Sequence, residues 1–183
     1  MRKFELTTDT KMLLGRKLFR IKALIDFGDV KAGEKGGYIE KEENLSQYGN
    51  AWIYGNAKVY GNAKVSGDAE VSGNARVSGN ARVSGDAEVS GNAWVYGNAE
   101  VSGNAWVYGD ADYATASGFG SEYRTTTFFK LKDSNEIGVR CGCFYGTLKE
   151  FRAKVKETHG ESKKAKEYLM LADLMEYRFL EEK

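Results

Sequence analysis

The sequence predicts a mainly β protein built around a parallel β-helix, with a small N-terminal β cap and a C-terminal ββαα domain. Three observations carry this prediction. From Gly49 to Tyr108 the chain repeats one unit ten times: Gly, Asn or Asp, Ala, any residue, Val or Ile, then Tyr or Ser. Proline is absent and glycine occurs 22 times, so the turns must be made by residues other than proline. Helix-like capping and spacing appear only after residue 146.

A period of six residues fits a coil with three short sides. An α-helix repeats every 3.6 residues, and a glycine in each unit would cost a helix about 1 kcal/mol. Three units make one coil, so residues 18 apart should lie above one another, about 4.8 Å apart. The inward columns are expected to be Ile53, Val71, Val89, Val107; Val59, Val77, Val95, Tyr113; and Val65, Val83, Val101, Phe119. Ile39 and Leu45, six apart, predict a first, looped coil from about Gly37.

The segments outside the repeats predict a cap at each end, because an open β-helix leaves edge groups bare. We expect residues 1–48 to form an N-terminal β cap with strands at 4–6 and 18–24, and residues 49–120 to form the coil. Residues 121–183 form the predicted C-terminal domain, with a hairpin from 125–131 and 137–141. Thr147 and Glu150 are a capping box that opens a helix to about Thr158, and a second helix starts near Ser162.

Several segments carry a family resemblance. They are Leu18-Phe19-Arg20-Ile21-Lys22-Ala23-Leu24, Gly36-Gly37-Tyr38-Ile39-Glu40, Glu43-Asn44-Leu45-Ser46, Cys141-Gly142-Cys143-Phe144-Tyr145-Gly146-Thr147-Leu148-Lys149-Glu150-Phe151 and Thr158-His159-Gly160. With the repeats, they resemble a family of phage and prophage hexapeptide-repeat proteins of the polymer-forming type. The repeat itself resembles the left-handed β-helix superfamily. The resemblance implies a left-handed coil and a phage or prophage context, and it implies no particular reaction.

Composition argues against some classes of partner and favours one cellular compartment. The formal net charge is +1, so no overall field favours nucleic acid or a membrane surface. The two cysteines, Cys141 and Cys143, suggest no disulfide framework. The start of the chain has no apolar segment of the kind found in a signal peptide. We therefore expect a protein of the host cytoplasm without a membrane partner.

The first enzymatic hypothesis is acyl transfer, because many left-handed β-helices are acyltransferases. Those enzymes place a histidine beside the coil, whereas the only histidine here, His159, follows the first predicted C-terminal helix. A histidine at a helix C-terminus is more often a capping residue. Cys141, Cys143 and His159 supply three metal ligands where structural zinc needs four. We expect no catalytic residue, no metal and no cofactor.

Two surfaces are candidates for binding. The outward positions of the coil combine aromatic and acidic side chains, which are typical of protein interfaces. This candidate contact surface consists of Trp52, Tyr54, Glu70, Glu88, Trp94, Tyr96, Trp106 and Tyr108. The predicted hairpin combines hydroxyls and cations that could bind a phosphate-bearing ligand. Its members are Arg124, Thr125, Thr126, Thr127, Lys130, Lys132 and Arg140.

The favoured functional hypothesis is a non-catalytic, oligomeric binding protein of phage or prophage origin. Its expected partners are its own copies, in a trimer, and a host protein or a small nucleotide signal that it blocks or sequesters in counter-defence. The trimer is expected because the coil has one acidic side and basic stretches on the other two, so neighbouring coils can pack in a ring. The alternative is an acyltransferase-like enzyme with an atypical base.

Overall fold

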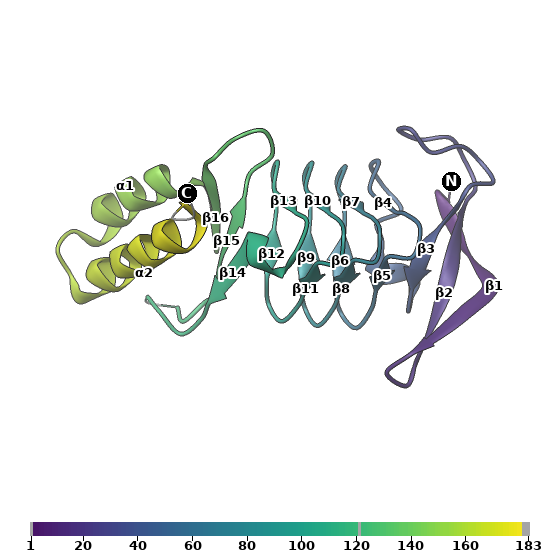
Figure 1. Cartoon of the computed structure of the whole chain (residues 1–183), viewed down its shortest axis with the longest axis horizontal. Coiled ribbons are helices and arrows are strands. Elements are labelled where there is room, and N and C mark those ends of the chain that lie inside the picture. The colour runs from purple at the N-terminus through teal and green to yellow at the C-terminus, as the bar shows by residue number, and fades with distance from the viewer. Residues whose placement is uncertain (1, 121, 181–183) are drawn as a thin grey trace.

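The computed structural model describes residues 2–120 and 122–180; residues 1, 121 and 181–183, which fall in the predicted terminal domains, lie outside this description. A parallel β-solenoid forms the middle of the molecule, with antiparallel strands at both ends and two helices at the C-terminal end (Figure 1). The protein is therefore mainly β, as the sequence predicts. The left-handed sense of the coil remains a prediction from the resemblance.

The solenoid has three faces of two-residue parallel strands. We name the faces after the charges or elements that they carry. The acidic face consists of β4 (Trp52–Ile53), β7 (Glu70–Val71), β10 (Glu88–Val89) and β13 (Trp106–Val107). The hairpin face contains β5 (Lys58–Val59), β8 (Arg76–Val77) and β11 (Trp94–Val95), and the basic face contains β6 (Lys64–Val65), β9 (Arg82–Val83) and β12 (Glu100–Val101). Strands on one face pair in register 18 residues apart, as with Val65 and Val83.

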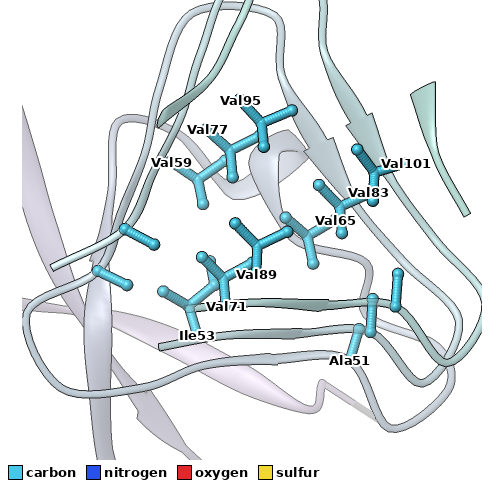
Figure 2. Close-up of a cluster of buried hydrophobic side chains, with 14 of the residues drawn as sticks. Ala51, Ile53, Val59, Val65, Val71, Val77, Val83, Val89, Val95 and Val101 are labelled. Carbon is cyan, nitrogen blue, oxygen red and sulfur yellow. The ribbon is translucent and has the colours of Figure 1, made fainter. Parts of the chain in front are cut away.

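The aliphatic position of every repeat points into the coil. Each of these side chains from Ile53 to Val107 is 0–1% exposed, and the alanines beside them are fully buried. Figure 2 shows the members of the three predicted columns from Ile53 to Val101 in the coil interior. Each buried valine contributes about 1.5–3 kcal/mol relative to an exposed one. The narrow interior of the coil accepts only small or β-branched side chains, and the repeat supplies Ala and Val or Ile at the inward positions.

The corners explain why glycine opens each repeat. Gly67 has a φ of +72°, a conformation that residues with a Cβ rarely adopt. A Cβ at Gly67 would also lie 2.9 Å from the backbone nitrogen of Gly85 in the coil above. Conformation and stacking both demand glycine at this corner.

The first coil is looped, as predicted. Strand β3 (Lys35–Ile39) pairs in parallel with β5, with Ile39 beside Val59, and Leu45 bridges to Val65. Each of these pairs is two residues longer than the regular spacing of 18. The 3-10 helix η1 (Glu42–Asn44) lies between the two pairs.

The N-terminal hairpin extends the hairpin face. Strands β1 (Phe4–Leu13) and β2 (Arg16–Ala23) are antiparallel, and β2 pairs with β3. The combined sheet has the order β1-β2-β3-β5-β8-β11. The cap is thus continuous with the coil and closes its N-terminal end. We call this end of the coil the lower end and the C-terminal end the upper end.

Two buried polar side chains cap the lower end of the corner columns. The amine of Lys3 donates to the carbonyls of Gly49 and Ala51, at 3.2 and 2.8 Å. The amide nitrogen of Asn44 donates to the carbonyls of Gly61 and Ala63, at 3.1 and 2.9 Å. Within the stack, the equivalent carbonyls accept hydrogen bonds from backbone N–H groups of the preceding coil. The N–H of Asn62, for example, donates to the carbonyl of Gly79. Lys3 and Asn44 therefore replace the donors of a missing coil.

The upper end carries the opposite kind of cap. Here backbone N–H groups lack acceptors, and side-chain oxygens supply them. The N–H of Trp94 donates to Asp110 at 2.7 Å, and the N–H of Glu100 donates to the hydroxyl of Thr127 at 2.9 Å. Asp112, in the 3-10 helix η2 (Asp110–Asp112), accepts from the N–H groups of Tyr108 and Gly109.

The third inward column does not continue to Phe119, so that expectation was wrong. After η2 the chain leaves the coil as β14 (Tyr113–Ala116), which pairs antiparallel with β15 (Thr126–Lys130). Phe119 packs with the C-terminal core instead. Phe129, on β15, and Leu131, just after it, join the core of the coil. A strand that crosses the open end covers it more completely than a further partial coil.

The C-terminal domain is a sheet covered by two helices. The predicted hairpin is β15 with β16 (Ile137–Cys141), and β14 and β17 (Phe144–Thr147) extend it to the order β14-β15-β16-β17. The helices are α1 (Leu148–His159) and α2 (Lys163–Leu180). The predicted capping box is present, because the hydroxyl of Thr147 accepts from the N–H of Glu150 while the Glu150 carboxylate accepts from the N–H of Thr147.

We predict that Val83→Asp abolishes folding while Arg82→Ala changes the thermal midpoint little. Val83 is fully buried, and an unpaired carboxylate there costs several kcal/mol. Arg82, the adjacent residue, is exposed. Circular dichroism melts of both variants measure the difference. A Val83→Asp protein that melts like the parent would contradict the inward column.

We predict that stability rises with pH between about 8 and 10 and falls above pH 10. Burial lowers the pKa of Lys3 from 10.5 to about 8, so in this window the unfolded state binds more protons. Burial raises the pKa of Tyr54, Tyr113 and Tyr168 from 10.0 to about 12, so above pH 10 the unfolded state binds fewer. Urea titrations across this range measure both slopes.

The control for this pH dependence is a pair of matched variants. Lys3→Met should reduce the rise between pH 8 and 10, leaving the part that comes from Lys58, whose pKa burial also lowers. The change should cost about 1–3 kcal/mol, because two buried carbonyls lose their donor. Lys17→Met changes an exposed lysine of β2 and should keep the rise. A rise of equal size in both variants would show that Lys3 is not its source.

Candidate functional site

The clearest candidate site is a pocket of about 320 Å³ in the C-terminal domain. It lies between α1, the first part of α2 and the turn that joins β16 to β17. Its lining combines a hydrophobic floor, two thiols and several charged side chains. The lining residues are Glu122, Arg124, Cys141, Gly142, Cys143, Phe144, Phe151, Lys154, Val155, Thr158, His159 and Tyr168.

Aromatic rings build the floor. Phe151 lies edge-on to Tyr168, with ring centroids 5.7 Å apart, and its ring centroid is 5.5 Å from that of Phe144. The ring of His159 stacks on Tyr168 at 5.9 Å, with 26° between the planes. Phe151, Val155 and His159 share one face of α1 because they are spaced four residues apart. A flat, apolar group would therefore find ring surfaces on several sides.

The thiol of Cys141 is held inside the domain. It accepts a hydrogen bond from the hydroxyl of Thr126 at 3.2 Å and lies 4.0 Å from the hydroxyl of Tyr168. Burial raises the pKa of Tyr168 to about 12, and the nearby Cys141 adds to the shift. Tyr168 is thus a neutral phenol at ordinary pH, and its hydroxyl also reaches the backbone carbonyl of Phe119 at 3.4 Å.

Cationic groups gather at the rim. Arg124 lies over the turn at Gly142, where an added Cβ would come within 2.8 Å of its guanidinium nitrogen. The φ of +59° at Gly142 also favours glycine. Lys154 lines the same pocket from α1, and Glu122 is the one acid among the described residues of the lining. The rim can therefore attract a ligand with a negative group.

The arrangement fits binding of an anionic ring compound better than metal chemistry. Within residues 2–120 and 122–180, no three His, Cys, Asp or Glu side chains lie close enough together to hold a metal ion. Cys143 is exposed, whereas Cys141 is half-buried and already bonded. Rings and cations are the groups that the pocket does bring together.

The predicted ligand hairpin is dispersed in the structure. Of its residues, only Arg124 lines the pocket. Thr126 and Thr127 are buried, so the expectation of accessible hydroxyls there was wrong: Thr126 bonds Cys141, and Thr127 caps the coil. Thr125 shares a hydrogen bond with Ser117 at 2.8 Å. The hairpin of β15 and β16 faces the coil because β15 covers the upper end of the coil.

The hairpin cations are used as ion pairs with acids of the coil. Lys130 pairs with Asp112 at 2.6 Å, and Arg140 pairs with Glu100 at 3.1 Å. Lys132, beyond β15, pairs with Glu88. These contacts join the C-terminal sheet to the coil, so the three cations do not form a common anion site.

The predicted contact surface on the coil is partly buried. Trp52 is 0% exposed, and its place on that surface was wrong. Phe4 and Phe27 lie edge-on to its ring, with centroids 6.3 and 5.3 Å away, because the N-terminal cap covers the first coil. Tyr54 is half-buried. The members of that surface with exposed aromatic rings are Trp94, Tyr96, Trp106 and Tyr108.

Nearby groups partly offset the charge repulsion between the stacked acids of the acidic face. Partial burial and the neighbouring Glu88 raise the pKa of Glu70, while a hydrogen bond from the Tyr54 hydroxyl opposes the rise. The ammonium of Lys132 lies against Glu88. Repulsion along this column is therefore offset from both ends, and Glu70 remains exposed in its middle.

Most of the pocket was not predicted from the sequence. Phe144, Phe151, Lys154 and Tyr168 received no functional role, although the spacing of residues 151, 155 and 159 places them on one helical face. That spacing predicts only that the side chains share a face. It does not predict that the β16–β17 turn and Arg124 lie opposite.

Comparison with known proteins supports the solenoid alone. A family model described as the YdcK Beta solenoid repeat matches residues 69–85, 75–91, 81–97 and 93–109. No curated protein matches the chain. In the described part of the chain, neither helix is both long and apolar enough to span a membrane. The matched segments all lie in the coil, so the chain is similar there to β-solenoid repeat proteins, and the pocket lies outside the matched residues.

Proposed function

We propose that this protein is a non-catalytic binding protein whose C-terminal pocket takes a small phosphate-bearing ring compound of the nucleotide kind. The observation that carries the proposal is the combination of aromatic floor and cationic rim in one pocket. Ligand pockets are mostly apolar with a few placed polar groups, and this lining has that character. Phage or prophage origin stays an expectation from the resemblance, and the role in counter-defence stays a hypothesis.

The floor suits a flat heterocycle. The rings of Phe144, Phe151 and Tyr168 are already arranged around the cavity, with edge-on and tilted contacts between them. Base–aromatic stacking contributes about 1–3 kcal/mol per base in single-stranded nucleic acid binding and tolerates every base. A pocket of about 320 Å³ admits one small ligand and no polymer segment.

The rim suits a phosphate. A guanidinium can hold two phosphate oxygens at once, and an ammonium supplies a point charge. Arg124 is 3.8 Å from the carboxylate of Glu122, and both side chains are more than half exposed. An exposed pair of this kind contributes about 0–1 kcal/mol, so a phosphate can displace Glu122 from Arg124.

The alternative, an acyltransferase-like enzyme, needs a histidine beside the coil and a neighbouring subunit. His159 lines a pocket whose residues all lie between 122 and 168, outside the coil. Its ring stacks on Tyr168. Turnover of acetyl-CoA that disappears in His159→Ala would favour the alternative over the proposal.

We predict that a nucleoside monophosphate binds this pocket and that Arg124→Ala and Lys154→Ala each weaken binding about tenfold or more. A hydrogen bond to a charged group contributes about 1.5–3 kcal/mol, and about 1.4 kcal/mol corresponds to tenfold. Calorimetric titration with AMP, GMP, CMP and UMP measures the affinities. Lys156→Ala, an exposed lysine on α1 outside the pocket lining, is the matched control and should bind as the parent does.

Two results would reject this site. One is the absence of binding by all four nucleotides to the folded parent. The other is an equal loss in Lys154→Ala and Lys156→Ala, which would mean that general charge attraction, and not the pocket, accounts for the affinity.

We also propose that the coil associates into a trimer, with the acidic face of one copy against the basic face of the next. Glu70 is exposed on the acidic face, and Lys64 and Arg82 are exposed on the basic face. Exposed ion pairs contribute about 0–1 kcal/mol each, so an aromatic anchor is needed. Trp106, 41% exposed on the acidic face and 6.2 Å from Tyr108, fits that role.

We predict that light scattering at low micromolar concentration gives a trimer mass for the parent and a monomer mass for Trp106→Ala. The double change Glu70→Lys with Glu88→Lys should weaken assembly less. Tyr123→Ala removes another exposed aromatic ring, in the C-terminal domain and outside the coil faces, and should leave the mass unchanged. A monomer mass for the parent at this concentration rejects the coil contact.

A further inference from the structure

Helix α2 has a second apolar side that no described residue covers. Met170, Leu174 and Tyr177 are 70%, 55% and 65% exposed. Their spacing of four and three residues places them in one stripe along the helix. Figure 1 shows α2, in yellow, at the C-terminal end of the molecule, remote from the N-terminal cap.

The stripe is separate from the side of α2 that forms the domain core. Ala165, Tyr168, Ala172 and Met175 pack into the C-terminal core. A helix at a protein surface ordinarily places charged residues opposite its buried side. Three large apolar side chains in a row at that position indicate a contact surface.

We propose that α2 pairs with α2 of a second copy, antiparallel about a two-fold axis at Leu174. Leu174 then lies against Leu174 of the second copy. Met170 lies four residues before Leu174 and Tyr177 three after it, so each Met170 meets Tyr177 of the other copy. Such a contact is isologous, because the same stripe serves on both sides. Methionine and tyrosine are enriched at interfaces of this kind.

Charge complementarity selects a second copy as the occupant. Glu167 and Arg178 flank the same edge of the stripe, seven residues before and four residues after Leu174. In an antiparallel pair this edge faces its own symmetry mate, so Glu167 of one copy lies near Arg178 of the other, and the reverse. The antiparallel arrangement thus forms two ion pairs, one from each Glu167 to the Arg178 of the other copy. A parallel arrangement forms neither.

Both flanking charges are available for this contact. Arg178 has no carboxylate within ion-pair distance among the described residues, and Glu167 has only Lys163, at 3.9 Å. The acids on the other side of the stripe are occupied, because Arg152 of α1 pairs with Asp173 and Glu176. The ion pairs across the axis therefore form without breaking a contact within the copy other than the long one to Lys163.

The experiment is sedimentation equilibrium of the full chain at high micromolar concentration. The parent should show a further twofold association of whatever particle is present at low concentration. Leu174→Asp should weaken this step about a hundredfold, because the change enters the contact twice and places two carboxylates together. Leu14→Asp changes another exposed leucine, at the hairpin tip, and should associate as the parent does.

Charge reversal tests the antiparallel arrangement. Glu167→Arg alone and Arg178→Glu alone should each weaken the twofold step, and both changes in one chain should restore it. Twofold association that survives Leu174→Asp overturns the proposal. So does a double reversal that fails to restore what the single reversals remove. The step does not involve the nucleotide pocket or Trp106, so its outcome is independent of the function proposed above.

Discussion

The hydrogen bonds between successive coils are the constraint on which the rest of this structure depends. Each coil offers backbone groups to the coil above and to the coil below, so the stack has no internal defect but leaves unpaired groups at both ends. An unpaired buried carbonyl or N–H costs about 1–3 kcal/mol, and several occur at each end of a coil. The terminal segments are explained by this requirement before any function is considered.

The two ends solve the problem with opposite chemistry. At the lower end, where carbonyls are open, the donors are the amine of Lys3 and the amide of Asn44. At the upper end, where N–H groups are open, the acceptors are Asp110, Asp112 and the hydroxyl of Thr127. Burial of Lys3 lowers its pKa to about 8, yet a neutral amine still carries two hydrogens for its two carbonyls. The cap therefore persists when the lysine loses its charge.

What the sequence predicts well is what repeats. The period of six residues, with Val at one position and Gly at another, determines the inward columns and the corners, because every coil presents the same physical problem. The ends have no such redundancy. Phe119 continues the spacing but not the coil, since an antiparallel strand covers the opening better. Trp52 has an outward position in the repeat, but Phe4 and Phe27 of the cap cover it.

The candidate site illustrates the same limit. Its helical half is readable from the spacing of Phe151, Val155 and His159, whereas Arg124 and the turn at Gly142 join it only through the tertiary packing of the C-terminal domain. The cations of the β15–β16 hairpin show why composition misleads here. Lys130 and Arg140 form ion pairs with acids of the coil, whereas Arg124 forms no ion pair with a coil acid in the described residues. A regular coil of valines can vary only on its outer surface. Specific recognition by a small ligand needs a concave site, and in this molecule the domain that closes the upper end of the coil provides one.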